Sequence, residues 1–263
     1  MKGLNESGID MQPVLDIAKR AGDAILQVYG SNDFGVEVKE DESPLTLADQ
    51  ASNAVIEAGL KEAYPEIPIL SEEMKEVPYS ERSGWESYWL VDPLDGTKEF
   101  IKRNGEFTVN IALVRNGSPV FGVVYQPVGE RLYYGGPAGG SYLSVSGAEE
   151  EKIEGGGHYS EEHDVVVVAS RSHLTDAVMA FVDELTEQGK EVTFLSAGSS
   201  LKLCLVAEGK ATVYPRFGPT MEWDTAAAHA VAVGAGKKVI NHESGEPLEY
   251  NKENLLNPWF IVE

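Results

Sequence analysis

Two stretches near the start of the chain show apolar residues at helical spacing. Over residues 11–29 they recur every three or four positions and predict an amphipathic helix that stops at Gly30. A second stripe begins near Thr46 and predicts a helix that ends before Pro65, because proline has no N–H with which to continue the hydrogen-bond ladder. The chain therefore opens with two helices.

A series of short β-rich runs follows the second helix. They fall at residues 67–70, 89–91, 107–115, 120–125 and 131–134. The third and fourth runs are separated by Asn-Gly-Ser-Pro at 116–119, which is typical turn chemistry and predicts an antiparallel hairpin. This part of the chain is therefore predicted to be α+β.

The pattern changes in the second half of the chain. Residues 135–164, rich in Gly, Ser and Glu, are predicted to form an irregular connection. After them, predicted strands alternate with predicted helices, which is typical of an α/β fold. The strands are at 165–169, 192–195 and 211–214, and the helices are at 174–188, from Ser199 and from about Trp223. We therefore predict an α+β portion over residues 1–150, which carries most of the candidate metal ligands, and an α/β portion over 151–263, which completes the substrate site.

Composition narrows the class of protein. The chain has 263 residues and a net charge of −22, which argues against nucleic acid polymers and anionic lipid as main partners, because both bind basic surfaces. Cys204 is the only cysteine, which excludes an intramolecular disulfide and fits a reducing compartment. Since no apolar run is long enough for a transmembrane segment, we expect a cytoplasmic protein. Peripheral attachment at the cytoplasmic side of the inner membrane stays open.

The strongest candidate for chemistry is the segment Asp-Pro-Leu-Asp-Gly-Thr at 92–97, which follows the apolar run 89–91. Two carboxylates three positions apart, with a rigid proline turn between them, can converge on one point. Mg²⁺ takes a few carboxylates together with water and phosphate oxygens. Gly96 and Thr97 add backbone N–H groups that can hold a phosphate if a helix or turn begins there. The alternative interpretation is an Asp-rich turn that caps a helix.

Three further acidic positions accompany this segment. Glu72 follows the run 67–70, Asp224 precedes a run of small residues, and Asp49 lies three residues after Thr46. Taken singly, each has an ordinary structural explanation: a Glu-Glu pair on the surface, a helix N-cap and a capping box, respectively. Taken together with the 92–97 segment, they predict one site.

The order of these motifs resembles that of the inositol monophosphatase superfamily of Mg²⁺-dependent, lithium-sensitive phosphatases. The resemblance rests on Leu-Ser-Glu-Glu at 70–73, Trp-Leu-Val-Asp-Pro-Leu-Asp-Gly-Thr at 89–97 and Trp-Asp-Thr-Ala-Ala-Ala at 223–228, and it covers nearly the whole chain. It implies a layered α-β-α-β-α sandwich of the inositol monophosphatase and sugar phosphatase type, and a homodimer. The segments 95–110, 170–173, 198–202 and 214–219 are similar to the CysQ-type 3′(2′),5′-bisphosphate nucleotidase branch.

The resemblance also implies roles for individual residues. The expected ligands of two or three Mg²⁺ ions are the carboxylates of Glu72, Asp92, Asp95 and Asp224 and the backbone carbonyl of Leu94. Glu72, Thr97 and Asp49 are the expected catalytic residues, and the last two resemble the pair that orients and deprotonates the attacking water. The residues expected to contact substrate are Glu72, Leu94, Asp95, Gly96, Thr97, His173, Ser199, Lys202, Arg216 and Asp224.

Four of these, His173, Ser199, Lys202 and Arg216, are the candidates for holding a second phosphate or a ribose. Two of the four have ordinary alternatives, Lys202 as a solvated surface charge and His173 as a cap of the helix at 174–188.

The expected reaction is hydrolysis of adenosine 3′,5′-bisphosphate to AMP and phosphate, with 3′-phosphoadenylyl sulfate as a further substrate and a link to sulfate assimilation. Lys98, Lys202 and Arg216 favour this reaction, because they supply positive charge for a second phosphate. Two alternatives stay open. One is a phosphatase of the same fold that acts on inositol monophosphate or fructose 1,6-bisphosphate, and the other is a metal-dependent nucleotide-binding regulator without turnover.

Overall fold

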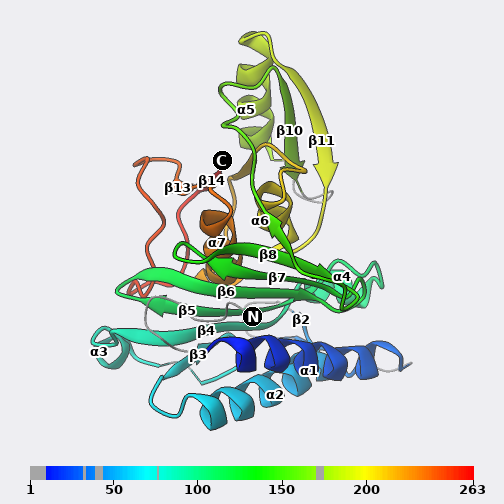
Figure 1. Ribbon diagram of the computed structural model, residues 1–263, viewed down its shortest axis with the longest axis vertical. Coiled ribbons are helices and arrows are strands. Elements are labelled where there is room, and N and C mark those ends of the chain that lie inside the picture. Colours follow the sequence, from blue (N-terminus) through cyan, green and yellow to red (C-terminus); the bar gives the residue numbers. More distant parts are fainter. Residues whose placement is uncertain (1–9, 32–33, 39–43, 76, 170–174) are drawn as a thin grey trace.

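The computed structural model of the protein describes residues 10–31, 34–38, 44–75, 77–169 and 175–263. Helices and sheets in these ranges stack in layers, with α1 and α2 below a large sheet and α6 and α7 above it (Figure 1). The helices are α1 (Gln12–Tyr29), α2 (Leu47–Ala63), α3 (Tyr79–Arg82), α4 (Thr97–Ile101), α5 (Asp176–Glu187), α6 (Leu201–Ala207) and α7 (Glu222–Gly234).

The large sheet runs in chain order from β3 to β9. Its first two strands are parallel and each later neighbour is antiparallel. Its strands are β3 (Ile69–Ser71), β4 (Ser87–Asp95), β5 (Thr108–Arg115), β6 (Ser118–Gln126), β7 (Arg131–Gly136), β8 (Gly140–Val145) and β9 (Glu151–Ile153). A separate short antiparallel pair is formed by β1 (Glu37–Val38) and β2 (Pro44–Leu45). The division of the chain at residue 150 stays a prediction, and β9 lies just beyond it.

A second β layer lies on the far side of α6 and α7. It contains a parallel pair and an antiparallel group, and a single bridge between Val167 and Val213 joins the two. Helix α5 packs against this layer. The strands are β10 (Asp164–Ala169), β11 (Glu191–Ser196), β12 (Tyr214–Arg216), β13 (Val239–Asn241) and β14 (Phe260–Val262). The layered α-β-α-β-α arrangement expected from the sequence is confirmed.

Small residues allow helix α7 to pack closely against the large sheet. Its buried face is mostly alanine, and the helix packs directly on the middle strands of the large sheet. The approach is so close that a Cβ on Gly122 of β6 would lie 2.0 Å from the backbone carbonyl oxygen of Ala227. This contact places the first turn of α7, which carries Asp224, at the edge of the sheet where β4 ends.

Most of the elements predicted from the sequence are confirmed, but the prediction for residues 135–164 is wrong. That stretch contains β8 and β9, where Tyr142 and Leu143 belong to regular antiparallel ladders. Gly and Ser residues hid the strands, because Gly140, Ser141 and Ser144 belong to β8 itself although these residue types are typical of turns. The strand predicted at 211–214 is displaced, since β12 begins at Tyr214. No helix within the described ranges is long and apolar enough to cross a membrane.

Candidate metal and phosphate site

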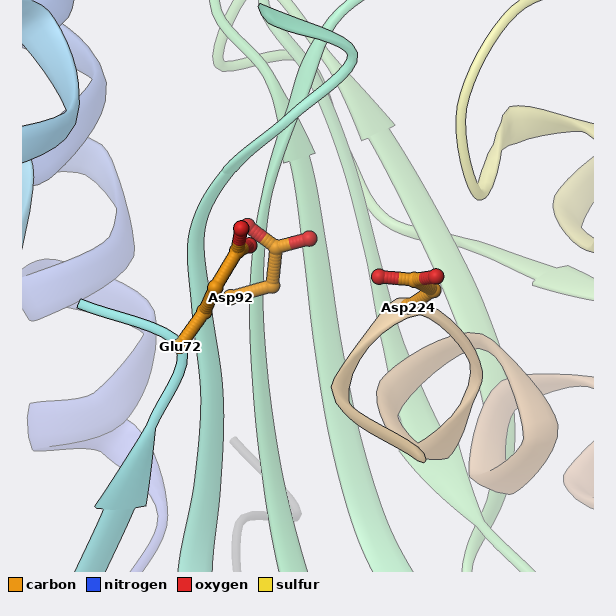
Figure 2. Close-up of side chains that lie close together, drawn as sticks. All are labelled: Glu72, Asp92 and Asp224. Atoms are coloured by element: carbon orange, nitrogen blue, oxygen red, sulfur yellow. The ribbon is translucent and has the colours of Figure 1, made fainter. Parts of the chain in front are cut away.

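Three carboxylates from distant parts of the chain converge at the edge where β3 and β4 end. The parallel register pairs Ser71 with Val91, so Glu72 and Asp92, the next residues on each strand, lie level with one another. Asp224 faces them from the first turn of α7 (Figure 2). Carboxylate oxygens of the three residues all lie within 4.8 Å of one another. The sequence prediction that these three motifs form one site is therefore consistent with their positions.

The cluster concentrates negative charge. Asp92 is buried, and its Oδ1 accepts a hydrogen bond from the Leu94 N–H at 3.0 Å. Burial, reinforced by the charge of Glu72, raises the pKa of Asp92 well above its usual range. Burial and the charge of Asp95 raise the pKa of Asp224 to about 8, against the lowering effect of the hydrogen bond from the Met221 N–H. Like charges this close are stabilised by a divalent cation, and carboxylate oxygens are the hard donors that Mg²⁺ takes together with water and phosphate oxygens.

Asp224 is not the N-cap that was the alternative interpretation of its motif. It occupies the third position of α7, and its Oδ2 accepts a hydrogen bond from the backbone N–H of Met221, the N-cap residue, at 2.8 Å. One carboxylate oxygen is thereby tied to the helix start, and the carboxylate as a whole faces Glu72 and Asp92 (Figure 2). Capping and metal binding are therefore compatible at this residue.

Asp95 and Leu94 lie beside the three-carboxylate cluster. The Asp95 carboxylate accepts a hydrogen bond from the Ser200 N–H at 2.5 Å, and burial raises its pKa to about 6 against the opposing effects of Lys202 and of this hydrogen bond. The Leu94 carbonyl oxygen lies 3.3 Å from the Thr97 hydroxyl. Their predicted roles as metal ligands stay predictions. Asp95 links the cluster to the neighbouring cavity, which it lines.

Thr97 and Asp49 are in contact, although 48 positions separate them. The Thr97 Oγ1 lies 3.2 Å from Asp49 Oδ1. The other oxygen of Asp49 accepts hydrogen bonds from the backbone N–H and the hydroxyl of Thr46, at 2.7 and 2.6 Å, which is the capping box of α2. The capping-box interpretation of Asp49 is therefore confirmed, and because the cap uses one oxygen while Thr97 contacts the other, it leaves room for the catalytic role, which stays a prediction.

The segment around Gly96 forms the corner between β4 and α4. Gly96 has φ +92°, a left-handed conformation that favours glycine, and helix α4 starts directly after it at Thr97. A Cβ at this position would lie 3.1 Å from the carbonyl oxygen of Glu106. Gly96 thus turns the chain into α4 where a side chain would be crowded, and the predicted use of the Gly96 and Thr97 N–H groups for phosphate stays a prediction.

A cavity of about 160 Å³ adjoins the cluster, shares Asp224 with it and is also lined by the neighbouring Asp95. Lys202 is 6% exposed, donates to the Ser199 carbonyl at 2.6 Å, and has its pKa lowered to about 8, chiefly by burial. Lys202 is therefore not the solvated surface charge that was its alternative interpretation. The residues that line the cavity are Asp95, Gly96, Glu99, Gly198, Ser199, Ser200, Lys202, Leu203, Tyr214, Arg216, Thr220, Asp224, Thr225 and Phe260.

Arg216 enters the same cavity from β12. Its Nη2 donates to the Pro219 carbonyl at 2.8 Å, and its Nε is buried with no hydrogen-bond partner among the described residues. An N–H group of this kind is available to an anionic ligand. Ser199, with φ +44°, lies in the same wall. His173, the fourth candidate for the second phosphate, lies outside the described residues.

Sequence reasoning missed several residues of this cavity. Glu99 follows Gly96 by three positions, one helical turn into α4, and that spacing could have placed it beside the site. Tyr214 lies in the segment 214–219 that the resemblance covers but was not singled out, whereas Thr220 and Phe260 are marked by no motif.

Comparison with known proteins shows to which family this chain belongs. The sequence model of the inositol monophosphatase family matches residues 10–258. The chain belongs to the inositol monophosphatase family. The resemblance drawn from the motifs is therefore confirmed, and enzymes of this family are metal dependent.

Individual members of the family resemble the chain over nearly its whole length. The 3′(2′),5′-bisphosphate nucleotidase CysQ of Salmonella typhimurium (strain LT2) is 48% identical over 254 residues, or 96% of this chain and 98% of that protein. The protein of the same name from Buchnera aphidicola is 41% identical, over 94% and 89% of the two chains. Among solved structures, CysQ from Bacteroides thetaiotaomicron has a TM-score of 0.84 and 49% identity over 95% of each chain.

The raised pKa of Asp224 gives a first prediction, which concerns how strongly Mg²⁺ stabilises the folded protein at different pH values. The pKa of Asp224 lies at about 8 in the folded, metal-free protein, whereas an Asp in an unfolded chain has a pKa of about 3.9. The folded protein therefore holds a proton that the unfolded chain has released, and its stability falls as the pH rises through this window. Mg²⁺ needs the ionised carboxylates, so we expect it to raise the unfolding temperature more at about pH 8.5 than at about pH 6.5.

Thermal unfolding with and without Mg²⁺ at both pH values measures this difference. His229, whose pKa is lowered to about 3 by burial, is still partly protonated in the unfolded chain at pH 6.5, but it affects stability equally with and without Mg²⁺ and so cancels from this difference. Asp224→Asn is the control, and it should remove most of the pH dependence. An equal Mg²⁺ effect at both pH values in the unmodified protein would contradict the assignment of these carboxylates to the metal.

Proposed function

We propose that the protein is a Mg²⁺-dependent phosphatase that removes the 3′-phosphate of adenosine 3′,5′-bisphosphate, giving AMP and phosphate, and that it also accepts 3′-phosphoadenylyl sulfate. The observation that carries the proposal is the junction of two features at Asp224, with Asp95 beside it: a cluster of carboxylates suited to cations, and a cavity with two cationic side chains. The names of the relatives, 3′(2′),5′-bisphosphate nucleotidase, support the same substrate. The homodimer expected from the family stays a prediction.

The proposed metal ligands are the carboxylates of Glu72, Asp92, Asp95 and Asp224 and the Leu94 carbonyl, which together would hold two or three Mg²⁺ ions. Bound ions would supply Lewis-acid chemistry, neutralising phosphate charge and favouring ionisation of water. The protein's part is to hold hard oxygen donors close together, and the cluster meets that requirement with Asp92 buried and Glu72 and Asp224 half-buried.

Thr97 and Asp49 are proposed to handle the proton of the attacking water. A hydroxyl has one hydrogen to donate, and if Thr97 donates it to Asp49 Oδ1, the Thr97 oxygen can accept a hydrogen bond from water. Asp49 is held in place by its two bonds from Thr46 to Oδ2, which leaves its Oδ1 directed toward Thr97. Water, Thr97 and Asp49 then form a path along which the proton leaves as the phosphate is attacked. A regulator that only binds nucleotide has no use for such a path.

The second phosphate of the substrate is assigned to the cationic side of the cavity. Lys202 and Arg216 project into it from α6 and β12, and both charges lie close enough to influence one another. A buried cation carries an electrostatic cost that a bound phosphate would offset. The Gly96 and Thr97 N–H groups are left for the phosphate that is cleaved. This division of roles requires a substrate with two phosphates.

The role of Thr97 gives a second prediction. Thr97→Ala removes the hydroxyl that orients the water, and we expect kcat to fall about 100-fold, while the dissociation constant for AMP stays nearly constant. Thr97→Ser keeps the hydroxyl and is the matched control, with a loss of about 10-fold or less. Steady-state kinetics and product binding measure the two quantities. If Thr97→Ala weakens AMP binding as much as it lowers kcat, Thr97 is a binding residue and the proton path is refuted.

The substrate is tested by comparing phosphate release from adenosine 3′,5′-bisphosphate, inositol 1-phosphate and fructose 1,6-bisphosphate under the same conditions. We expect kcat/KM to be highest for the nucleotide. A clear preference for inositol phosphate or for the sugar bisphosphate would favour the alternative activities of the same fold and refute the proposal.

A variant at Lys202 tests whether this residue faces the second phosphate of the substrate. Lys202→Met keeps the apolar stem of the side chain and removes the charge proposed to face the second phosphate. We expect kcat/KM to fall about 30-fold for adenosine 3′,5′-bisphosphate, because a charge-assisted contact contributes about 2 kcal/mol. The loss for inositol 1-phosphate, which has one phosphate, should be much smaller. Equal losses for both substrates would place Lys202 at the cleaved phosphate instead.

A further inference from the structure

Glu222 is a fully buried carboxylate two residues before Asp224. It occupies the first position of α7 and has 0% exposure. Its Oε2 accepts a hydrogen bond from the Asn251 N–H at 2.7 Å, and its Oε1 accepts bonds from the Lys252 N–H at 3.0 Å and the Lys252 ammonium at 2.6 Å. Two of these three donors belong to the backbone. Glu222 therefore fastens a turn of the chain to the start of α7.

Arg82 holds the same turn, residues 251–253, by hydrogen bonds from its other side. Arg82 is 3% exposed and donates to the Asn251 side chain and to the carbonyls of Lys252 and Glu253, at distances of 2.6–2.9 Å. The Asn251 side chain returns a hydrogen bond to the Arg82 carbonyl at 2.7 Å. Asn251 has φ +67°, a left-handed conformation that is sparsely populated outside glycine. The turn is thus held in one conformation between a buried cation and a buried anion.

Beyond this turn, residues 254–257 wrap around the first turn of α7. The Glu222 N–H donates to the Leu255 carbonyl at 2.9 Å, and the Asn257 side chain donates to the Met221 carbonyl at 2.8 Å. Met221 is also the residue whose N–H is bound by the Asp224 carboxylate, at 2.8 Å. A short chain of hydrogen bonds therefore runs from the 251–257 segment to the carboxylate that faces Glu72 and Asp92 (Figure 2).

Stability alone is a weak reason for this arrangement. Burying an ion pair costs desolvation energy, and apolar replacements of such pairs are often as stable or more so. A buried carboxylate that accepts two backbone N–H groups does what an apolar side chain cannot, because it fixes the position of the backbone itself. Residues behind metal ligands commonly fix ligand geometry in this way, and changing them lowers metal affinity about 10- to 100-fold.

We infer that Glu222 is a positioning residue for the metal site: it holds the 251–257 segment against the first turn of α7 and so keeps the Asp224 carboxylate opposite Glu72 and Asp92. The inference rests on the proposed metal-binding role of Asp224. It also gives a function to Glu222, an acidic residue next to the Trp-Asp motif that the motif itself does not explain.

Mn²⁺ binding tests the inference, because carboxylate sites that take Mg²⁺ also take Mn²⁺ and free Mn²⁺ is counted directly by electron paramagnetic resonance. Glu222→Gln places an amide N–H₂ against backbone N–H donors, so at least one anchor is lost. We expect Mn²⁺ affinity to fall about 10-fold. Wild-type affinity in this variant overturns the inference. Absence of Mn²⁺ binding by the unmodified protein overturns the proposed function as well, which separates the two failures.

Two control variants distinguish positioning from general destabilisation. Glu208→Gln removes another carboxylate with little exposure, which is ion-paired with Arg131 at 2.9 Å and also bonded to Tyr133 and Lys210. Lys252→Met removes the charge beside Glu222 but leaves both backbone N–H anchors. Both should bind Mn²⁺ like the unmodified protein, whatever their unfolding temperatures, and an equal loss of affinity in Glu208→Gln overturns the inference.

A milder variant covers the case in which Glu222→Gln does not fold. Arg82→Lys keeps the positive charge but loses the fork that holds the Lys252 and Glu253 carbonyls. It should weaken Mn²⁺ binding several-fold, and unchanged affinity in the folded variant overturns the inference.

Discussion

Asp92→Asn is expected to lower phosphate release from adenosine 3′,5′-bisphosphate by at least about 1,000-fold, which corresponds to about 4 kcal/mol of transition-state stabilisation. The substitution preserves shape, and the new Asn Oδ1 can still accept the hydrogen bond that Asp92 receives from the Leu94 N–H. What it removes is the negative charge at the centre of the cluster with Glu72 and Asp224. Without that charge we expect the proposed site to lose its affinity for Mg²⁺.

The same variant should unfold at a higher temperature than the unmodified protein when both are free of metal. Burial and the charge of Glu72 raise the pKa of Asp92, which means that its ionised form is disfavoured in the folded state. A neutral Asn relieves that repulsion. Asp183→Asn, an exposed change on α5, is the control and should alter neither property. Wild-type turnover in Asp92→Asn would refute the metal assignment, and a lower unfolding temperature would refute the electrostatic account of the cluster.

Gly122→Ala is expected to cause the largest loss of stability among single substitutions near the site. The added Cβ would meet the Ala227 backbone at 2.0–2.8 Å, and backbone atoms of a packed helix cannot move aside as a side chain can. We expect a loss of about 3 kcal/mol or more, seen as a fall of about 10 °C in the unfolding temperature or as insoluble protein.

Gly139→Ala is the matched control for this loss. Gly139 lies in the turn after β7, and a Cβ there would have nothing within 4 Å. We expect this variant to unfold within about 2 °C of the unmodified protein. Similar stability of the two alanine variants would show that α7 can move away from β6, and the close packing would then not be what positions Asp224.

Sequence patterns were sufficient to predict the elements that end at the site. The acidic residues Glu72 and Asp92 each follow an apolar run, and parallel pairing of β3 and β4 brings them level, so local pattern and site coincide there. Thr46 and Asp49 likewise form the expected capping box. These features depend on short-range chemistry, which a sequence displays directly.

Other features depend on contacts between distant segments and could not be predicted. Asp95 accepts a hydrogen bond from Ser200, 105 positions away, which sets it apart from the three clustered carboxylates. Gly122 shows its importance only once α7 lies on β6. Strand β8 was overlooked because turn residues dominate its surroundings, although it pairs with β7 along its whole length.

The central claim is that these carboxylates make the protein a metal-dependent phosphatase for a nucleotide with two phosphates. Its most direct test is phosphate release from adenosine 3′,5′-bisphosphate by protein stripped of metal with EDTA, measured before and after addition of excess Mg²⁺. We predict no detectable release before addition and full activity after it, with AMP as the nucleotide product. Hydrolysis that proceeds equally in EDTA, or no hydrolysis with Mg²⁺ present, would contradict the account.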